Sequence, residues 1–243
     1  MIEQDVLVTT RHGQMPAFTA CPSEPGRYPA ILFYMDAPGI REELRHMARR
    51  IARHGYFCIL PDMYYRLGTV RFDLPRRDDR MSAVIGAAMR HLDDDRVMED
   101  TAGLLAFVDA HDRVRPGPVG SVGYCMSGRY ATVAAARFPH RFASAASLYG
   151  VGLVTEDETS PHRLVDRIRG EMYYGFAETD GAAPPETIAA LQAALDAAKT
   201  RYVLDVHPGT RHGYCFTAGA AYETIAAEKT WDRLFDLWDR TLT

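Results

Sequence analysis

Residues 119–128 read Val-Gly-Ser-Val-Gly-Tyr-Cys-Met-Ser-Gly, and this stretch decides the fold class of the chain. The first six residues have the length and apolar character of a buried strand, and the alanine-rich residues 127–138 predict a helix. Cys125 therefore lies on a tight strand-to-helix turn, where a nucleophilic side chain is exposed above the sheet. The helix N-terminus favours negative charge there, as on a thiolate or an oxyanion. The alternative is that Cys125 is simply buried, as free cysteines commonly are.

The segments on either side of this turn alternate between strand and helix patterns. Continuous apolar runs predict strands at residues 29–35, 56–60, 119–124, 142–149, 171–176 and 202–206. Apolar residues at helical spacing predict helices at residues 40–54, 97–110, 127–138, 184–199 and 218–241. A hairpin is expected from residues 6–10 and 15–20 around His12 and Gly13, and residues 63–95 are expected to be irregular.

Strands that alternate with helices predict an α/β fold with a mainly parallel sheet and helices on both faces. The leading hairpin would add antiparallel strands at one edge of that sheet. In such sheets the active site lies at the carboxyl ends of the strands. Polar residues directly after each apolar run are therefore the candidates for chemistry.

The composition of the chain excludes several function classes. It has 243 residues, 47% hydrophobic and 25% charged, with 28 basic and 32 acidic side chains and a net charge of −4. Such a length suits one α/β domain spanning residues 1–243, and the mild acidity argues against a nucleic-acid or anionic membrane surface. No run of 18 apolar residues predicts a membrane-spanning helix. Residues 1–5 are acidic and lack an apolar core, so we expect no signal peptide.

Four cysteines stand at positions 21, 58, 125 and 215. They form no CxxC pair and have no metal-ligand spacing, so we expect no bound metal and no cofactor. This sparse usage predicts reduced thiols and a cytoplasmic location.

A thiolate nucleophile needs a base, and the base needs an acidic residue to orient it. Two of the nine histidines, His207 and His212, follow the last predicted strand, and His212 is favoured because it lies in a glycine-flanked loop. Asp180, directly after the strand at 171–176, is favoured as the acid over Asp205, which lies within a strand pattern. The order nucleophile, acid, base matches the chain order of an α/β-hydrolase triad.

The oxyanion of an acyl-transfer reaction needs two backbone N–H donors. Met126 follows the nucleophile and supplies the first. Ala37 supplies the second from the loop after the strand at 29–35, because Pro38 has no N–H. Asp36 in the same loop is expected to lie near the thiol, unless it serves only as a turn or helix-start residue.

Taken together, four stretches make the sequence resemble the dienelactone hydrolase family of α/β-hydrolases. They are residues 33–40, residues 55–64, the Gly-Tyr-Cys turn at 123–125, and His-Gly-Tyr at 212–214. The resemblance implies an eight-stranded α/β-hydrolase without a large cap, with Cys125, Asp180 and His212 as its triad. It further implies Met126 and Ala37 as oxyanion donors, and it places Asp36 where the family has a glutamate that acts on the cysteine thiol.

The sequence also departs from the family pattern, because no arginine shortly follows His212 to clamp a substrate carboxylate. Such an arginine would have to come from the region that holds Arg66, Arg71, Arg76, Arg77 and Arg80. A more apolar pocket is expected from the aromatic residues Tyr64, Tyr124, Tyr214 and Phe216.

We therefore expect a hydrolase that cleaves a small carboxylic ester or lactone, other than dienelactone itself, through an acyl-enzyme on Cys125. Its partners would be small-molecule substrates, with no nucleic acid and no membrane, and the chain would be a monomer or homodimer. Two rival hypotheses stay open. One is a catalytically silent α/β-hydrolase fold that binds a small molecule, and the other is a thiol redox sensor in which Cys215 resolves Cys125.

Overall fold

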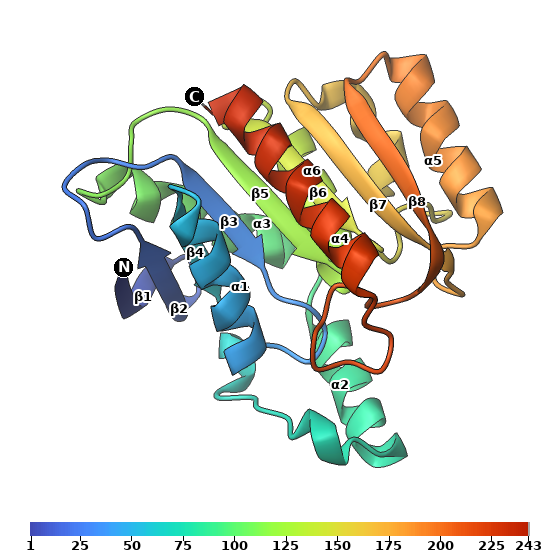
Figure 1. Cartoon of the computed structure of the whole chain (residues 1–243), viewed down its shortest axis with the longest axis horizontal. Coiled ribbons are helices and arrows are strands. Elements are labelled where there is room, and N and C mark those ends of the chain that lie inside the picture. The colour runs from blue at the N-terminus through green and yellow to red at the C-terminus, as the bar shows by residue number, and fades with distance from the viewer. Residues whose placement is uncertain (243) are drawn as a thin grey trace. The chain divides into compact units, whose positions relative to one another are not determined.

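A computed structural model describes residues 1–242, and Figure 1 shows it. Within these residues the chain forms eight strands, which make a mainly parallel sheet, and six α-helices. The expected α/β fold class is thereby confirmed. The chain divides into two compact units, which meet in sequence between Gly117 and Pro118 and are described one at a time.

Unit 1 contains four strands in the order β1-β2-β4-β3. Their bounds are β1 Ile2–Thr10, β2 Gly13–Cys21, β3 Ala30–Tyr34 and β4 Phe57–Pro61. The expected hairpin is present, because β1 and β2 pair antiparallel from Ile2 opposite Cys21 to Thr10 opposite Gly13. Strand β2 also pairs antiparallel with β4, whereas β3 and β4 are parallel. Every residue of β3 and β4 is buried, which explains why both read as unbroken apolar runs.

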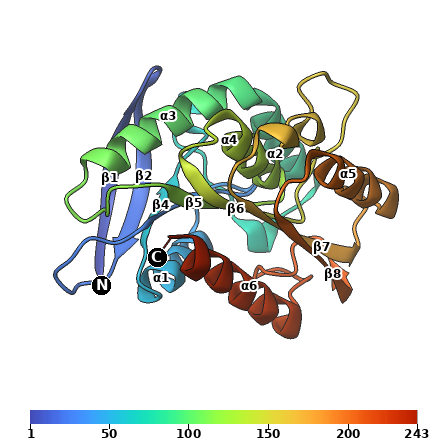
Figure 2. The same ribbon diagram turned by 90° about the horizontal axis from the view of Figure 1, so that it is seen from above.

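Helices lie on both faces of the unit 1 strands, with α1 on one face and α3 on the other (Figure 2). The three helices of the unit are α1 Glu42–Arg53, α2 Asp79–His91 and α3 Asp94–Ala110. Helix α1 buries Leu44, Met47 and Ile51 on one stripe and carries arginines between them. It ends where the sequence predicts, at His54 followed by Gly55 with a φ of 94°.

The expectation that residues 63–95 are irregular was wrong. This region holds α2 and two 3₁₀ turns, η1 Tyr65–Leu67 and η2 Leu74–Arg76. The Asp78 carboxylate caps α2 by accepting a hydrogen bond of 2.7 Å from the Met81 N–H. Only Ile85 and Ala88 of this helix are buried. The helix therefore lacks the regular apolar stripe by which an amphipathic helix is recognised in a sequence.

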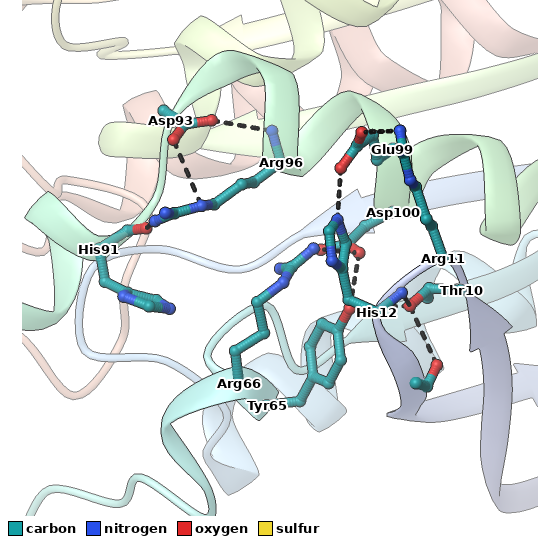
Figure 3. Close-up of polar contacts among 11 residues, drawn as sticks. Thr10, Arg11, His12, Tyr65, Arg66, His91, Asp93, Arg96, Glu99 and Asp100 are labelled. Carbon is teal, nitrogen blue, oxygen red and sulfur yellow. Dashed lines mark hydrogen bonds and ion pairs between the residues drawn. The ribbon is translucent and has the colours of Figure 1, made fainter.

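A polar cluster fixes η1 and the hairpin turn to helix α3 (Figure 3). The buried Asp100 carboxylate accepts two hydrogen bonds of 2.8 Å from the Arg66 guanidinium and one of 2.8 Å from the Tyr65 hydroxyl. Glu99, one residue earlier, pairs with Arg11 at 2.8 Å and also contacts His12. The buried carboxylate of Asp100 thus anchors η1, the segment that follows β4, to helix α3 within unit 1.

Unit 2 contains four parallel strands in the order β5-β6-β7-β8. Their bounds are β5 Val119–Tyr124, β6 Phe142–Leu148, β7 Glu171–Thr179 and β8 Tyr202–Arg211. The helices are α4 Met126–Arg137, α5 Pro185–Ala198 and α6 Thr224–Leu242, with the short turns η3 Pro161–Arg163 and η4 Val165–Arg167 against α5. Figure 2 shows α4 on one face of these strands and α6 on the other.

The largest differences from the expected element boundaries in unit 2 concern β8 and α6. Strand β8 continues past residue 206 to Arg211, so His207 lies inside the strand and His212 is the first residue after it. Helix α6 begins at Thr224 instead of residue 218, because residues 217–221 form turns and bends. No helix among residues 1–242 is both long and apolar enough to cross a bilayer.

Candidate active site

Cys125 occupies the single residue between the end of β5 and the start of α4. Its backbone has φ 56° and ψ −119°, a strained conformation for a residue with a side chain. Neighbouring backbone enforces it: the Cys125 N–H donates to the Leu148 carbonyl at 3.0 Å, and the Val151 N–H donates to the Cys125 carbonyl at 3.0 Å. Cys125 is partly exposed, unlike the other three cysteines.

The turn around Cys125 is built from residues that have no room for larger side chains. A Cβ at Gly123 would lie 2.0 Å from the Ser127 carbonyl oxygen, and one at Gly128 would lie 2.6 Å from the Gly150 Cα. Ser127 itself is fully buried. The small residues of this stretch are therefore required by the close approach of β5, α4 and the chain that follows β6.

His212 joins Cys125 to Asp180. The His212 Nδ1 lies 2.7 Å from the Asp180 Oδ2, and the His212 ring is close enough to Cys125 for this thiol to contribute to its raised pKa. Asp180 directly follows β7, and its Oδ1 accepts a hydrogen bond of 2.9 Å from the Ala182 N–H. The three side chains thus lie together at the carboxyl ends of β5, β7 and β8.

The electrostatics of this group favour a charged pair between His212 and Asp180. Burial lowers the pKa of His212, but the hydrogen bonds and charges of Asp180 and Cys125 outweigh it and raise that pKa to about 10. For Asp180, burial acts in the opposite direction and raises the pKa. The hydrogen bonds from His212 and from the Ala182 N–H outweigh burial, so the pKa of Asp180 is lowered overall. At neutral pH the site therefore holds an imidazolium beside a carboxylate.

Asp36, in unit 1, forms a bidentate ion pair with Arg41, a residue that the sequence analysis did not single out. The Arg41 Nη1 and Nη2 lie 2.5 Å and 3.0 Å from the two Asp36 carboxylate oxygens, and Nη2 also lies 2.9 Å from Glu43. Burial raises the pKa of Asp36, and the Arg41 charge opposes that change. The signal in the sequence was the arginine five residues after Asp36, at the start of α1.

The loop that carries Ala37 is held from two further directions. The Arg41 Nη1 donates to the Gly39 carbonyl at 3.2 Å, and the Tyr64 hydroxyl donates to the Ala37 carbonyl at 2.8 Å. Tyr64 is fully buried, and its ring is the nearest neighbour of Gly39, which has a φ of 77°. In this structure Tyr64 thus binds the loop itself.

Residues 15–242, nearly the whole chain, match the family model described as "Dienelactone hydrolase family". The chain belongs to the dienelactone hydrolase family. A relative named "Putative carboxymethylenebutenolidase" from Methylorubrum extorquens is 26% identical, covering 99% of this chain and 81% of its own. A protein of the same name from Synechocystis is 25% identical, covering 98% and 96%.

The fold also resembles a crystal structure titled as a putative dienelactone hydrolase from Klebsiella pneumoniae. The TM-score is 0.88 at 22% identity, with 98% of each chain covered. The fold of this chain is therefore that of a dienelactone hydrolase-like α/β-hydrolase, and the protein is a hydrolase of that type.

In this dienelactone hydrolase family member, the competing base and acid, His207 and Asp205, belong to a different network. His207 is buried, with Nε2 lying 3.3 Å from the Tyr173 hydroxyl. Asp205 accepts a hydrogen bond of 3.3 Å from the same hydroxyl and pairs with Arg233 at 2.8 Å. His212, and not His207, is the histidine that lies beside Asp180 and Cys125.

Three of the four aromatic residues proposed for the pocket, all except Tyr64, lie in one aromatic group of unit 2. The Tyr124 ring lies 5.5 Å from the Phe216 ring, and both are buried, as is Tyr214. Tyr149, which the sequence analysis did not consider for the site, touches this group and lies with its ring 5.1 Å from the His212 ring. Its position directly after β6, at the carboxyl edge of the sheet, was the available signal.

Four of the five arginines considered as a carboxylate clamp contact protein groups inside unit 1. Arg66 binds Asp100 (Figure 3), and Arg71 pairs with Asp62 at 2.9 Å. The more exposed Arg76 and Arg77 contact Asp73 and Ser82 respectively. Arg80 is exposed on α2.

All four cysteines are free thiols, and the three besides Cys125 are buried. Burial raises the pKa of the Cys215 thiol to about 12, so this thiol is protonated at neutral pH. Among residues 1–242, no cluster of three or more histidine, cysteine or acidic side chains has the arrangement of a metal site.

Proposed function

We propose that this dienelactone hydrolase family member cleaves a small carboxylic ester or lactone with Cys125 as nucleophile, His212 as acid and base, and Asp180 as the orienting acid. One observation carries the proposal: His212 is hydrogen-bonded to Asp180 and lies close enough to Cys125 for that thiol to raise its pKa, while Cys125 stands on a strained strand-to-helix turn. This is the geometry that covalent acyl transfer requires.

In the first half of the reaction the Cys125 sulfur attacks the substrate carbonyl carbon, and a carbon–sulfur bond forms. The imidazolium of His212 stabilises negative charge on the sulfur beforehand and then gives its proton to the departing alkoxide oxygen. In the second half, neutral His212 takes a proton from a water molecule, whose oxygen attacks the acyl carbon. The carbon–sulfur bond breaks, and the carboxylic acid leaves.

The tetrahedral oxyanion needs hydrogen-bond donors, and backbone N–H groups at the start of a helix point toward such a charge. Met126 is the first residue of α4, and its N–H is proposed as one donor. The Ala37 N–H stays a prediction as the second. In support, the Ala37 loop is fixed within unit 1 by Tyr64 and by the Asp36–Arg41 pair.

For Asp36, the buried ion pair with Arg41 favours a role in holding this loop. The action on the thiol that the family resemblance implies stays a prediction. The two roles differ in their effect on the pH profile of hydrolysis, which only the second would change.

The substrate is proposed to be small and without a carboxylate of its own. Arg66 and Arg71 are bound to buried aspartates, and the side chains near His212 are aromatic. We expect kcat/KM for a neutral ester to exceed that for the matching ester with a free carboxylate, measured side by side. Cytoplasmic location and a monomeric or homodimeric state stay predictions.

The proposal is tested with p-nitrophenyl acetate. Cys125→Ala should abolish the release of p-nitrophenol, and intact-protein mass spectrometry of the wild type should detect an acetyl group on Cys125 early in turnover. Cys21→Ala, which removes a buried thiol of unit 1, is the matched control and should keep the wild-type rate. Unchanged turnover in Cys125→Ala would remove Cys125 from the mechanism. Binding of esters without hydrolysis would favour the silent binding protein instead.

A further inference from the structure

Helix α6 turns an apolar face inward, and Thr230 is the polar residue on it. Trp231, Leu234 and Phe235 are buried on this helix, and Thr230 is only 1% exposed among them. A buried hydroxyl is costly unless it is hydrogen-bonded, so its partners indicate what it does.

The partners of Thr230 lie on both sides of His212 in the sequence. Its Oγ1 lies 3.1 Å from the hydroxyl of Tyr214, two residues after His212, and 3.4 Å from the Nε2 of His207, five residues before it. One hydroxyl of α6 thus holds the two ends of the segment that carries His212.

The segment between these ends contains bends that need support. Gly209 and Gly213 have φ values of 72° and 88°. Within the segment, the Thr210 hydroxyl donates to the His207 carbonyl at 2.6 Å, and the Tyr214 N–H donates to the Arg211 carbonyl at 3.1 Å. These bonds define local turns, and the contacts with α6 fix the turns relative to the rest of unit 2.

Tyr149 connects Tyr214 to the catalytic histidine. Its ring lies 5.2 Å from the Tyr214 ring and 5.1 Å from the His212 ring, edge-on to both. A shift of Tyr214 would therefore displace a side chain that packs directly on His212, because close-packed interiors transmit such changes.

We propose that Thr230 is a positioning residue for His212, acting through Tyr214 and His207 without touching the reacting atoms. This inference rests on the proposed function, in which His212 must reach Cys125 and Asp180 together. A small displacement of a catalytic group lowers the rate of the chemical step, while it changes the affinity for the substrate much less.

The test compares Thr230→Val, which keeps the shape and removes the hydroxyl, with Thr230→Ser, which keeps the hydroxyl. Thr230→Val should lower kcat for p-nitrophenyl acetate about five- to tenfold, the equivalent of one lost hydrogen bond, with little change in KM. Thr230→Ser should restore most of that rate. Tyr214→Phe removes the facing hydroxyl, and its effect should not add to that of Thr230→Val.

A second measurement does not depend on turnover. In a histidine NMR titration, the pKa of His212 should be lower in Thr230→Val than in the wild type, because its contacts with Asp180 and Cys125 loosen. A folded Thr230→Val that keeps both the wild-type kcat and the wild-type His212 titration overturns the inference. If Thr230→Val does not fold, Tyr214→Phe gives the same two readouts. Absent hydrolysis in the wild type refutes the proposed function, while the titration still tests the positioning.

Discussion

Asp180→Asn removes the charge that orients His212 while keeping the size of the side chain. In the wild type the Asp180 Oδ2 lies 2.7 Å from the His212 Nδ1, and the Asp180 side chain is almost fully buried. An asparagine amide in the same place can present its NH₂ group to that nitrogen. His212 would then carry its proton on Nε2 and could no longer accept one on the side facing Cys125.

The expected loss of kcat/KM follows from the lost hydrogen bond between Asp180 and His212. A hydrogen bond to a charged group contributes about 1.5–3 kcal/mol, and about 1.4 kcal/mol of barrier corresponds to a tenfold change in rate. The bond by itself therefore accounts for a loss of roughly 10- to 150-fold in kcat/KM. The wrong tautomer adds to this, so we expect a loss of at least about 100-fold for p-nitrophenyl acetate.

The same variant should change how stability depends on pH. The pKa of His212 is raised from 6.5 to about 10 in the folded protein, so its contribution is complete below pH 6.5 and is lost as pH rises toward 10. The pKa of Asp180 is lowered from 3.8, so its contribution is present above that value and is lost in more acidic solution. The difference in Tm between wild type and Asp180→Asn should thus be largest near about pH 5 and should shrink by about pH 9.

The test measures initial rates of p-nitrophenyl acetate hydrolysis and Tm for the wild type and Asp180→Asn between about pH 5 and about pH 9. Asp196→Asn is the matched control, because Asp196 is an exposed carboxylate of α5 that accepts a hydrogen bond from Tyr202. It should keep wild-type kinetics. The reasoning is refuted if Asp180→Asn folds and retains kcat/KM within about threefold, a change smaller than the loss of one hydrogen bond to a charged group.

Three further variants test the turn at Cys125 and the Ala37 loop. Gly128→Ala places a Cβ within 2.6 Å of Gly150 and should lower both Tm and activity, whereas Gly86→Ala on α2 meets only the flexible end of an arginine and should not lower Tm. Tyr64→Phe removes the hydrogen bond to the Ala37 carbonyl and should lower kcat about five- to tenfold with KM unchanged; an unchanged kcat would count against the Ala37 N–H as a donor. Asp36→Asn breaks the bidentate ion pair with the half-buried Arg41, whose contact with Glu43 remains, and should reduce the free energy of unfolding in urea by about 1.5–3 kcal/mol.

The local sequence determined most elements of the fold and the position of Cys125 on its turn. Apolar runs and helical spacing depend on residues close in the chain, which is why the sequence predicts β3, β5, α4 and the strained turn at Cys125. Helix α2 escaped prediction because it buries only two residues, and its stability depends on an aspartate cap and on packing.

The sequence also favoured Asp180 and His212 over their competitors, but the pairing itself is a fact of the tertiary structure. Asp180 and His212 follow different strands, and only the parallel pairing of β7 with β8 brings their side chains to within 2.7 Å.

The sequence by itself determined which residues could do chemistry, because the turn around Cys125 is a local feature of the chain. Only the tertiary structure decided their partners: Arg41 for Asp36, Asp100 for Arg66, and Tyr149 and Asp180 for His212. The physical reason is the range of the interactions. Backbone conformation is set by neighbours in sequence, whereas the partner of a buried polar group is whichever group the packing of distant segments places beside it.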